Sequence, residues 1–340
     1  MNKRAFLSAL FLLTFFTSCV YRATNEIKDQ VAVNTETAKP PAPKVENHPD
    51  AVLQQQIQEL VSKANARVGI GAVLLETGDS VFIDPDGHFP SQSVYKLPIA
   101  MALLRRIDAK ELRIDQQIMV EKSDFVRVGF HSPIRNENPG GAVLPLGELV
   151  RASVSESDGT ASDVLLELAG GPTAVQAYLA GIGIKDFIVA DSEKEISKDW
   201  ETQYRNWATP RASIDLLREV QFGDSLSEQS RRLLIGLLTD SNTGRRRMKA
   251  GLPPGTSLAH KTGTGGTKDG ITGATNDIGI ITMPDGRHIA IAVYVSDSTD
   301  DGWTRERLMA DIAKTVWERW VGTTEPNDVV LGISTKRQNT

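Results

Sequence analysis

Cysteine and paired histidines are nearly absent from this 340-residue chain. The single cysteine, Cys19, cannot form an intrachain disulfide or a cysteine-rich metal site. The five histidines include no His-x-His or His-x-x-x-His pair, so the usual zinc signature is also missing. Lys and Arg number 38 against 43 Asp and Glu, which gives a net charge of -5 and no excess of basic residues for nucleic acid. We therefore expect neither a metal or other cofactor nor a nucleic-acid partner.

The first 18 residues have the pattern of an export signal. Lys3 and Arg4 precede an apolar run over residues 5–16, which is shorter than the roughly 20 residues that a membrane-spanning helix needs. The residues directly before Cys19 resemble a bacterial lipobox, in which cleavage exposes a cysteine that carries lipid. We expect a lipoprotein signal peptide over 1–18 and a periplasmic protein anchored to the membrane only by lipid on Cys19. A plain secretory signal with an incidental cysteine is the alternative.

Composition divides the rest of the chain into three segments. Residues 19–50 are polar and contain several prolines, as expected of a lipid-anchor region followed by a flexible spacer. Residues 51–322 show apolar periodicity without an internal repeat, which predicts one folded domain. A second polar stretch, residues 323–340, closes the chain as a tail.

Strand-like patterns occur near both ends of this domain, whereas its middle has helical periodicity. The expected strands cover residues 67–76, 81–83, 257–261, 276–282 and 288–295. The expected helices of the middle cover residues 94–106, 146–153, 161–168, 174–179, 210–220 and 227–238, and a last helix covers 305–320. We predict an α+β fold in which both ends, about 51–88 and 245–322, build one antiparallel sheet around an inserted all-helical lobe, about 89–244. A pocket is expected between the two lobes.

A serine and a lysine three residues apart stand at the start of one expected helix. Ser93 and Lys96 then share one helix face within hydrogen-bond reach, and the helix N-terminus favours an oxyanion at the serine. Such a pair can make a nucleophile. By itself the Ser-x-x-Lys pattern carries no weight, because a chain of this composition holds about one such match by chance.

Two further short motifs follow along the chain. Ser157-Asp158-Gly159 comes after an expected helix, and Lys261-Thr262-Gly263-Thr264 ends an expected strand. Each alone is also compatible with an ordinary turn, a helix cap or a degraded phosphate loop. The turn after the second motif lacks the Gly-Lys-Ser/Thr ending of a phosphate loop, and the chain contains no Gly-x-Ser-x-Gly nucleophile elbow.

In their order and spacing, the three motifs resemble the active-site set of the class A serine β-lactamases and the related penicillin-binding proteins. The resemblance extends over residues 51–322 and is closest to the extended-spectrum branch that includes the PER-type and CfxA-type enzymes. It implies the serine β-lactamase/penicillin-binding-protein-like fold, a monomer and small-molecule β-lactam substrates. The implied activity is hydrolysis of penicillins and cephalosporins through an acyl-serine intermediate, which confers antibiotic resistance.

The resemblance assigns a role to each matching catalytic residue. Ser93 attacks the lactam carbonyl, and Lys96 takes part in the removal of its proton. Ser157, held by Lys261, passes a proton to the departing lactam nitrogen. Glu193 stands where the family places the carboxylate that activates water for deacylation.

The resemblance also assigns substrate binding to Arg247, Thr262, Gly263 and Thr264. Arg247 and Thr262, together with Lys261, are expected to hold the substrate carboxylate. The backbone N–H groups of Ser93 and Thr264 are expected to form the oxyanion hole.

Three alternatives stay open. Glu195, two residues after Glu193, is a competing hydrolytic carboxylate. A penicillin-binding or sensor domain that is acylated but deacylates slowly would carry the same serine and lysine motifs, although Glu193 argues against it. From another class, the chain could be a non-catalytic lipoprotein that binds cell-wall fragments, which the intact set of motifs disfavours.

Several positions depart from the family pattern. Gly159 replaces the asparagine that helps to grip the acylamino group of the substrate. Ser197 stands where an asparagine commonly positions the hydrolytic water, and His131 stands where an aromatic ring usually lines the entrance. These departures concern rates and antibiotic range more than the type of reaction.

The segment that carries Glu193 also lacks an ion pair found in many class A enzymes. The arginine and aspartate that close its neck in those enzymes correspond here to Asp191 and Asn206. We expect no cation at this neck, and we expect three rings to hold the segment instead, those of Trp200, Tyr204 and Trp207. If the segment is held in this way, we expect the floor of the pocket to be wider. We therefore predict efficient hydrolysis of bulky oxyimino-cephalosporins.

Overall fold

The computed structural model describes residues 46–322 of the chain. The expected signal peptide, the lipidation site Cys19 and the tail over 323–340 lie outside the described residues, so they stay predictions. The expected spacer is described only at its end, where His48–Pro49 form strand β1. Some residues assigned to the spacer therefore belong to the sheet.

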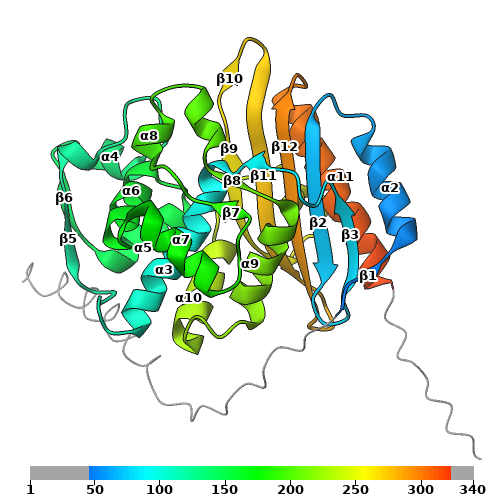
Figure 1. Cartoon of the computed structure of the whole chain (residues 1–340), viewed down its shortest axis with the longest axis horizontal. Helices are drawn as coiled ribbons and strands as arrows, with labels where there is room; N and C mark the ends of the chain where they lie inside the picture. Colours follow the sequence, from blue (N-terminus) through cyan, green and yellow to red (C-terminus); the bar gives the residue numbers. More distant parts are fainter. Residues whose placement is uncertain (1–45, 323–340) are drawn as a thin grey trace, which may run out of the picture. The chain divides into compact units, whose positions relative to one another are not determined.

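One sheet occupies the centre of the described part, and strands from both ends of the domain contribute to it (Figure 1). Its order is β1-β3-β2-β12-β11-β10, and β9 also pairs with β11. The strands cover Arg67–Leu74 (β2), Asp79–Ile83 (β3), Ser257–Thr264 (β9), Thr267–Lys268 (β10), Ile271–Thr282 (β11) and His288–Ser298 (β12). The pairs are antiparallel except β1 with β3, which is parallel. The predicted α+β fold is confirmed.

The central strands are buried on both faces, which explains their nearly continuous apolar sequences. Every residue of β2 after Arg67 is buried, and β12 pairs with β2 from Ile289 opposite Leu74 to Ser296 opposite Arg67. On the other edge of β11, the register places Lys261 of β9 opposite Ile278. The position of Lys261 is therefore fixed by the ladder of a buried sheet.

Helices α2 (Ala51–Val61) and α11 (Gly302–Val321) cover one face of the sheet (Figure 1). Each begins at an aspartate cap: the side chain of Asp50 accepts the N–H of Leu53, and that of Asp301 accepts the N–H of Thr304. Within residues 46–322, no helix is both long enough and apolar enough to cross a membrane.

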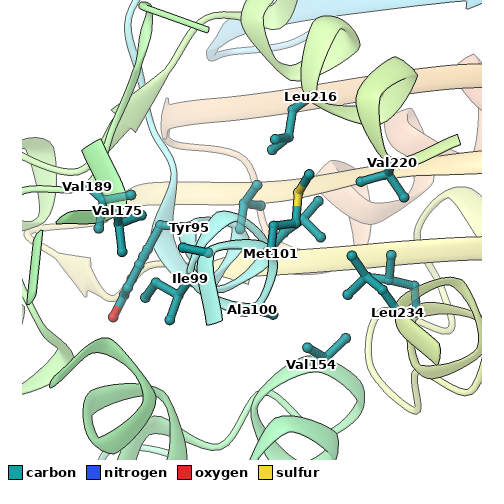
Figure 2. Close-up of a cluster of buried hydrophobic side chains, with 14 of the residues drawn as sticks. Tyr95, Ile99, Ala100, Met101, Val154, Val175, Val189, Leu216, Val220 and Leu234 are labelled. Carbon is teal, nitrogen blue, oxygen red and sulfur yellow. The ribbon is translucent and has the colours of Figure 1, made fainter. Parts of the chain in front are cut away.

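The other face carries the helices from the middle of the sequence. They are α3 (Lys96–Asp108), α4 (Pro133–Glu137), α5 (Leu146–Ser155), α6 (Gly159–Leu168), α7 (Gly171–Gly181), α8 (Glu193–Ile196), α9 (Pro210–Phe222) and α10 (Glu228–Thr239), with short 3-10 turns η1 (Gln92–Tyr95), η2 (Lys122–Asp124) and η3 (Glu201–Tyr204). The turn η4 (Met248–Gly251) instead packs against α11, and Met248 is buried with the residues of α2 and α11. Helix α3 lies inside the group of helices on the second face, and Figure 2 shows its residues Ile99 and Met101 among side chains such as Val154 and Leu234. Because α3 is surrounded, the residues at its start are held rigidly.

This helical region also contains short strands that were not expected from the sequence. They are β4 (Phe89–Pro90), β5 (Gln117–Val120), β6 (Ala142–Pro145), β7 (Phe187–Ile188) and β8 (Trp207–Ala208). Strand β5 pairs with β6, and β8 pairs with both β4 and β7. Segments this short show no clear period of two residues, so periodicity could not identify them. The β4–β8 pair places the chain before Ser93 beside the segment that carries Glu193.

Candidate active site

A cavity of about 260 Å³ lies between the sheet and the helices. The predicted site residues in its lining are Ser93, Lys96, Ser157, Glu193, Arg247, Thr262 and Thr264. Lys261 and Gly263 lie behind this lining, and the Lys261 amine reaches it through a bond to Ser157. The fold thus brings together residues from η1, the α5–α6 turn, α8 and β9.

Ser93 and Lys96 lie at the junction of η1 and α3. Gln92, directly before Ser93, has a φ of 48°, in the left-handed region, so the chain turns sharply as it enters the helix. Ser93 Oγ lies 3.5 Å from Glu193 Oε1, and Lys96 Nζ lies 2.9 Å from the same oxygen. One carboxylate oxygen therefore faces both the hydroxyl and the amine, an arrangement that can move a proton among the three groups.

Lys96 is almost completely buried, with 1% of its surface exposed. Besides its ion pair with Glu193, its ammonium donates a hydrogen bond to the backbone carbonyl of Ser157 at 2.8 Å. A buried charge is tolerated when it is both paired and hydrogen-bonded, as here. Lys96 thereby joins the two halves of the site, one around Ser93 and one around Ser157.

Of the two candidate carboxylates, Glu193 faces the cavity. The Glu193 side chain is 11% exposed, whereas that of Glu195 is 49% exposed and pairs with Lys198. Glu193 and Glu195 are two residues apart on α8, a single turn capped by Ser192, so their side chains project from different sides of it. The geometry therefore favours Glu193 as the hydrolytic carboxylate.

Asp163 holds Glu193 in place and was not identified from the sequence. Its carboxylate accepts the backbone N–H of Glu193 at 2.7 Å and that of Lys194 at 3.0 Å. Burial raises the pKa of Asp163 to about 6, although these two N–H bonds act in the opposite direction. The available signal was an acidic residue within the apolar pattern of α6, because a buried carboxylate needs partners.

Ser157 and Lys261 form the second half of the site. Ser157 has a φ of 62° and directly precedes Asp158, the N-cap of α6. The Lys261 ammonium donates to Ser157 Oγ at 2.9 Å. Burial lowers the pKa of Lys261 well below its usual range, and the positive charge of Lys96 acts in the same direction. An ammonium that releases its proton more readily can supply a leaving group through the Ser157 hydroxyl.

Arg247 lines the cavity and also supports the end of β9. Its guanidinium donates to the carbonyls of Gly263 at 3.0 Å and Asn276 at 2.8 Å, and to Thr264 Oγ1 at 2.7 Å. Glu306 lies 3.5 Å from its Nε, and burial lowers the pKa of Arg247. A cation is thereby fixed in the cavity wall, where it can attract a substrate carboxylate.

Gly263 is required by the close packing of β9 against the turn before α3. A Cβ at this position would lie 2.5 Å from the carbonyl oxygen of Ser91. The backbone of β9 therefore passes directly beside the segment that carries Ser93. This approach is what an oxyanion hole made from the N–H groups of Ser93 and Thr264 requires.

The positions that depart from the family pattern have local explanations. The N–H of Gly159 donates to the carbonyl of His131 at 2.9 Å, and a Cβ at Gly159 would lie 3.2 Å from that oxygen and 3.3 Å from a methyl group of Val126. The His131 ring is bonded to a backbone carbonyl at 2.9 Å, and Phe130, not identified from the sequence, also lines the cavity. Ser197 donates its hydroxyl to a backbone carbonyl of its own short helix at 2.7 Å.

The expectation that no cation stands at the neck of the Glu193 segment is wrong. This segment, residues 190–207, is called the glutamate loop below. Arg205 Nε lies 3.2 Å from the Asp191 carboxylate. The buried Asn206 amide accepts the N–H groups of Ala190 and Asp191 at 2.7 and 2.9 Å and donates to the Asp191 carbonyl at 2.9 Å. An asparagine amide can close a loop in this way because it offers both a donor and an acceptor to the backbone.

The expected ring packing in the glutamate loop is only partly present. Trp200 and Tyr204 meet edge to face, with ring centroids 6.4 Å apart. Trp207 instead stacks on His88, at 3.5 Å between centroids. Rings therefore support the loop at two separate places rather than as one cluster.

Comparison with known proteins places this site in a family. A family model described as "Beta-lactamase enzyme family" matches residues 52–320. The chain belongs to this β-lactamase family. It is 38% identical to Beta-lactamase VEB-1 of Pseudomonas aeruginosa over 271 residues, which cover 79% of this chain and 90% of that protein. It is 37% identical to Extended-spectrum beta-lactamase PER-1 of the same organism over 268 residues, 78% of this chain and 87% of that one.

Solved structures agree with this assignment. The crystal structure of TLA-3 extended-spectrum beta-lactamase matches with a TM-score of 0.78 at 37% identity and covers 79% of this β-lactamase and 98% of that chain. An ancestral class A β-lactamase matches with a TM-score of 0.72 at 34% identity, over 79% and 100% of the two chains. This β-lactamase is a class A hydrolase that opens the β-lactam ring through an acyl-serine intermediate and confers resistance to β-lactam antibiotics. The family resemblance identified from the motifs is confirmed.

Proposed function

We propose that this β-lactamase has an extended spectrum and uses Ser93 as its nucleophile and Glu193 as its deacylating base. The observation that supports these roles is the single Glu193 oxygen that faces both Ser93 Oγ and Lys96 Nζ in the cavity wall. Support for the spectrum comes from the names of PER-1 and TLA-3, two similar proteins that are called extended-spectrum β-lactamases.

In the acylation step, Ser93 Oγ bonds to the lactam carbonyl carbon and the lactam C–N bond breaks. The Ser93 proton passes to the Lys96–Glu193 pair, which lies within 3.5 Å of the hydroxyl through its carboxylate. The lactam nitrogen receives a proton from Ser157, whose hydroxyl is bonded to the Lys261 ammonium. The proton taken from Ser93 then replaces the one given by Ser157 and Lys261, so Glu193 is ionised again once the acyl-enzyme has formed.

In the deacylation step, Glu193 takes a proton from water, and the hydroxide adds to the acyl carbon. The bond to Ser93 Oγ then breaks, and the serine regains its proton from Glu193, which is thereby ionised again. Asp163 fixes the backbone of Glu193 for this step through its two N–H bonds. A domain that deacylates slowly would have no need of a carboxylate at this place, so Glu193 also separates this proposal from a penicillin-binding or sensor function.

The substrate is proposed to be held by its carboxylate at Arg247 and Thr262 and by its carbonyl oxygen in the N–H groups of Ser93 and Thr264. Arg247 and Thr262 line the cavity together, and the Arg247 guanidinium is fixed by three hydrogen bonds. Because the cation is already ordered, little side-chain entropy is lost when the carboxylate binds.

Steady-state kinetics of the purified enzyme test first whether hydrolysis needs a metal and then which substrates the enzyme accepts. A chromogenic cephalosporin should be hydrolysed at the same rate with and without a chelator, because no step uses a metal. The kcat/KM for a cefotaxime- or ceftazidime-type substrate is then compared with that for benzylpenicillin. A ratio below about 10⁻³, equivalent to about 4 kcal/mol of lost transition-state stabilisation, would contradict the extended spectrum.

The proposed location is the periplasm, with the enzyme as a monomer anchored by lipid on Cys19. The support is the sequence of the first 19 residues, which combines a short apolar run with a single cysteine directly after it. Replacement Cys19→Ala should move the mature enzyme from the membrane fraction to the soluble periplasm. A wild-type enzyme that is already soluble would contradict lipidation.

A further inference from the structure

A tyrosine of the glutamate loop is hydrogen-bonded to a residue near the end of strand β12 in the central sheet. Tyr204, the last residue of η3, donates its phenol hydroxyl to Asp297 Oδ1 at 2.6 Å. Asp297 lies near the end of β12, and its Oδ2 is 3.5 Å from Arg67 Nη1 at the start of β2. Three residues from the loop, β12 and β2 thus form one chain of contacts that the catalytic steps above do not use.

The acceptor in this chain is held firmly. Asp297 has a φ of 53°, in the left-handed region, which a residue with a side chain adopts only when its surroundings stabilise it. Its partner Arg67 donates to the carbonyl of His88 at 3.2 Å and lies over the ring of Phe89, 4.9 Å from the centroid. The Tyr204 hydroxyl is therefore bonded to a fixed point of the sheet.

The residue next to Tyr204 connects this contact to the cavity. Gln203 accepts a hydrogen bond from the side-chain amide of Gln92 at 2.9 Å, and both side chains are buried. Gln92 lines the cavity directly before Ser93. A Cβ at Gly273 would lie 2.4 Å from the Gln203 amide oxygen, so this glycine is needed to admit the amide between the loop and the sheet. A shift of Tyr204 would therefore be transmitted to the cavity wall.

In the acylation geometry proposed above, the acyl side chain of a bound substrate is expected to face the glutamate loop, since Glu193 lines the cavity opposite the groups that take the carbonyl oxygen and the nitrogen. When the carbonyl carbon is bonded to Ser93, its oxygen points to the N–H groups of Ser93 and Thr264, and its nitrogen points to Ser157. The remaining substituent is directed toward the wall that contains Glu193. A bulky substituent therefore contacts the loop, whereas a small one leaves it free.

We propose that Tyr204 and Asp297 are positioning residues that hold the glutamate loop in the place where bulky acyl side chains bind. The proposal rests on the acyl-serine geometry at Ser93 given under the proposed function. Glu193 has a separate anchor in Asp163, so release of Tyr204 disturbs the binding of a bulky side chain and leaves water activation intact.

The first test is Tyr204→Phe, which removes the hydroxyl and keeps the ring. The KM for an oxyimino-cephalosporin should rise at least about fivefold, because the loop then has to be ordered when substrate binds, while its kcat and both constants for benzylpenicillin stay within about twofold. Tyr178→Phe is the matched control. The Tyr178 hydroxyl is hydrogen-bonded to Ser225 Oγ at 3.0 Å, away from the glutamate loop. Tyr178→Phe should therefore leave kcat and KM unchanged for both substrates.

The second test uses Asp297. Asp297→Gly removes the acceptor, and glycine fits the left-handed backbone at this position. It should therefore raise the KM for the oxyimino-cephalosporin as much as Tyr204→Phe does. The double variant should have a KM no higher than that of either single variant. Asp297→Asn keeps an acceptor in a residue type that tolerates this backbone, so it should retain most of the wild-type KM. Equal losses for both substrate classes, or an effect of Asp297→Asn as large as that of Asp297→Gly, would overturn the proposal.

The two proposals can fail separately. If the wild-type enzyme does not hydrolyse the oxyimino-cephalosporin, the extended spectrum is wrong. The compound is then used as an inhibitor of benzylpenicillin hydrolysis, and Tyr204→Phe should still weaken its inhibition constant at least about fivefold. An unchanged inhibition constant would overturn the positioning role of Tyr204.

Discussion

Lys96 Nζ lies 2.9 Å from Glu193 Oε1, with both side chains in the wall of the active-site cavity. An unpaired charge at this depth would cost several kcal/mol, so removal of either side chain would leave the charge of its partner buried without compensation. The same carboxylate oxygen faces Ser93, which couples the proposed nucleophile to the proposed deacylating base. Substitution of Lys96 or Glu193 therefore changes both the charge balance of the cavity and the reaction rate. Replacements that keep the shape of the side chain separate these two effects best.

The buried carboxylate of Asp163 predicts a pH-dependent stability. Its pKa is raised from 3.8 to about 6, so between these values the folded protein keeps a proton that the unfolded chain has lost. The stability from this group is fully present below about pH 4 and decreases by about 3 kcal/mol as pH rises through 6. Urea unfolding of wild type and Asp163→Asn across this range measures it. The decrease should be missing in Asp163→Asn, and parallel pH curves for the two proteins would contradict the raised pKa.

The guanidinium of Arg247 predicts a double effect on substitution. Arg247→Ala should raise KM for penicillins about tenfold or more, because a charge-assisted bond to the substrate carboxylate contributes roughly 1.5–3 kcal/mol. It should also lower Tm, because the carbonyls of Gly263 and Asn276 lose their donor. Arg246→Ala is the control, since that side chain is 73% exposed and pairs with Glu306. An unchanged KM in Arg247→Ala would mean that another cation holds the carboxylate.

The neck of the glutamate loop predicts unequal effects from two neighbouring residues. Asn206→Ala leaves one buried and one partly buried N–H group without an acceptor and should cost about 2–4 kcal/mol of unfolding free energy. Arg205→Ala removes an ion pair whose arginine is 64% exposed and should cost less than about 1 kcal/mol. Denaturant unfolding of both variants measures the difference. A larger loss in Arg205→Ala would show that the ion pair, not the amide, closes the loop.

Long elements of the fold were predictable because their burial leaves a continuous trace in the sequence. Strands β2 and β12 are apolar over most of their length since both faces are covered, and they were found near their true bounds. Strands β4 and β8 have two residues each, and only tertiary contacts define them. The same limit applies to His48–Pro49, which joins the sheet from a segment with the composition of a spacer.

Within the site, the residues identified from the sequence are those whose chemistry requires a motif at fixed spacing. Ser93 and Lys96 share one turn, so their proximity follows from local geometry. Asp163 acts through contacts with residues distant in sequence, and Phe130 is placed in the cavity lining by the fold. No local pattern exists for either position. Arg205 shows a further limit: the two charges of the ion pair are exchanged, with the anion at Asp191 and the cation one residue before Asn206.

The most direct test of the central claim is intact-mass analysis of the enzyme mixed with a penicillin. Glu193→Gln keeps the shape of the side chain but cannot act as a base, so it should accumulate a covalent adduct that persists after wild type has returned to its unmodified mass. Ser93→Ala should show no adduct, and Glu195→Gln should behave as wild type. Prompt turnover by Glu193→Gln, an adduct on Ser93→Ala, or a long-lived adduct on wild type would contradict acylation of Ser93 and deacylation by Glu193.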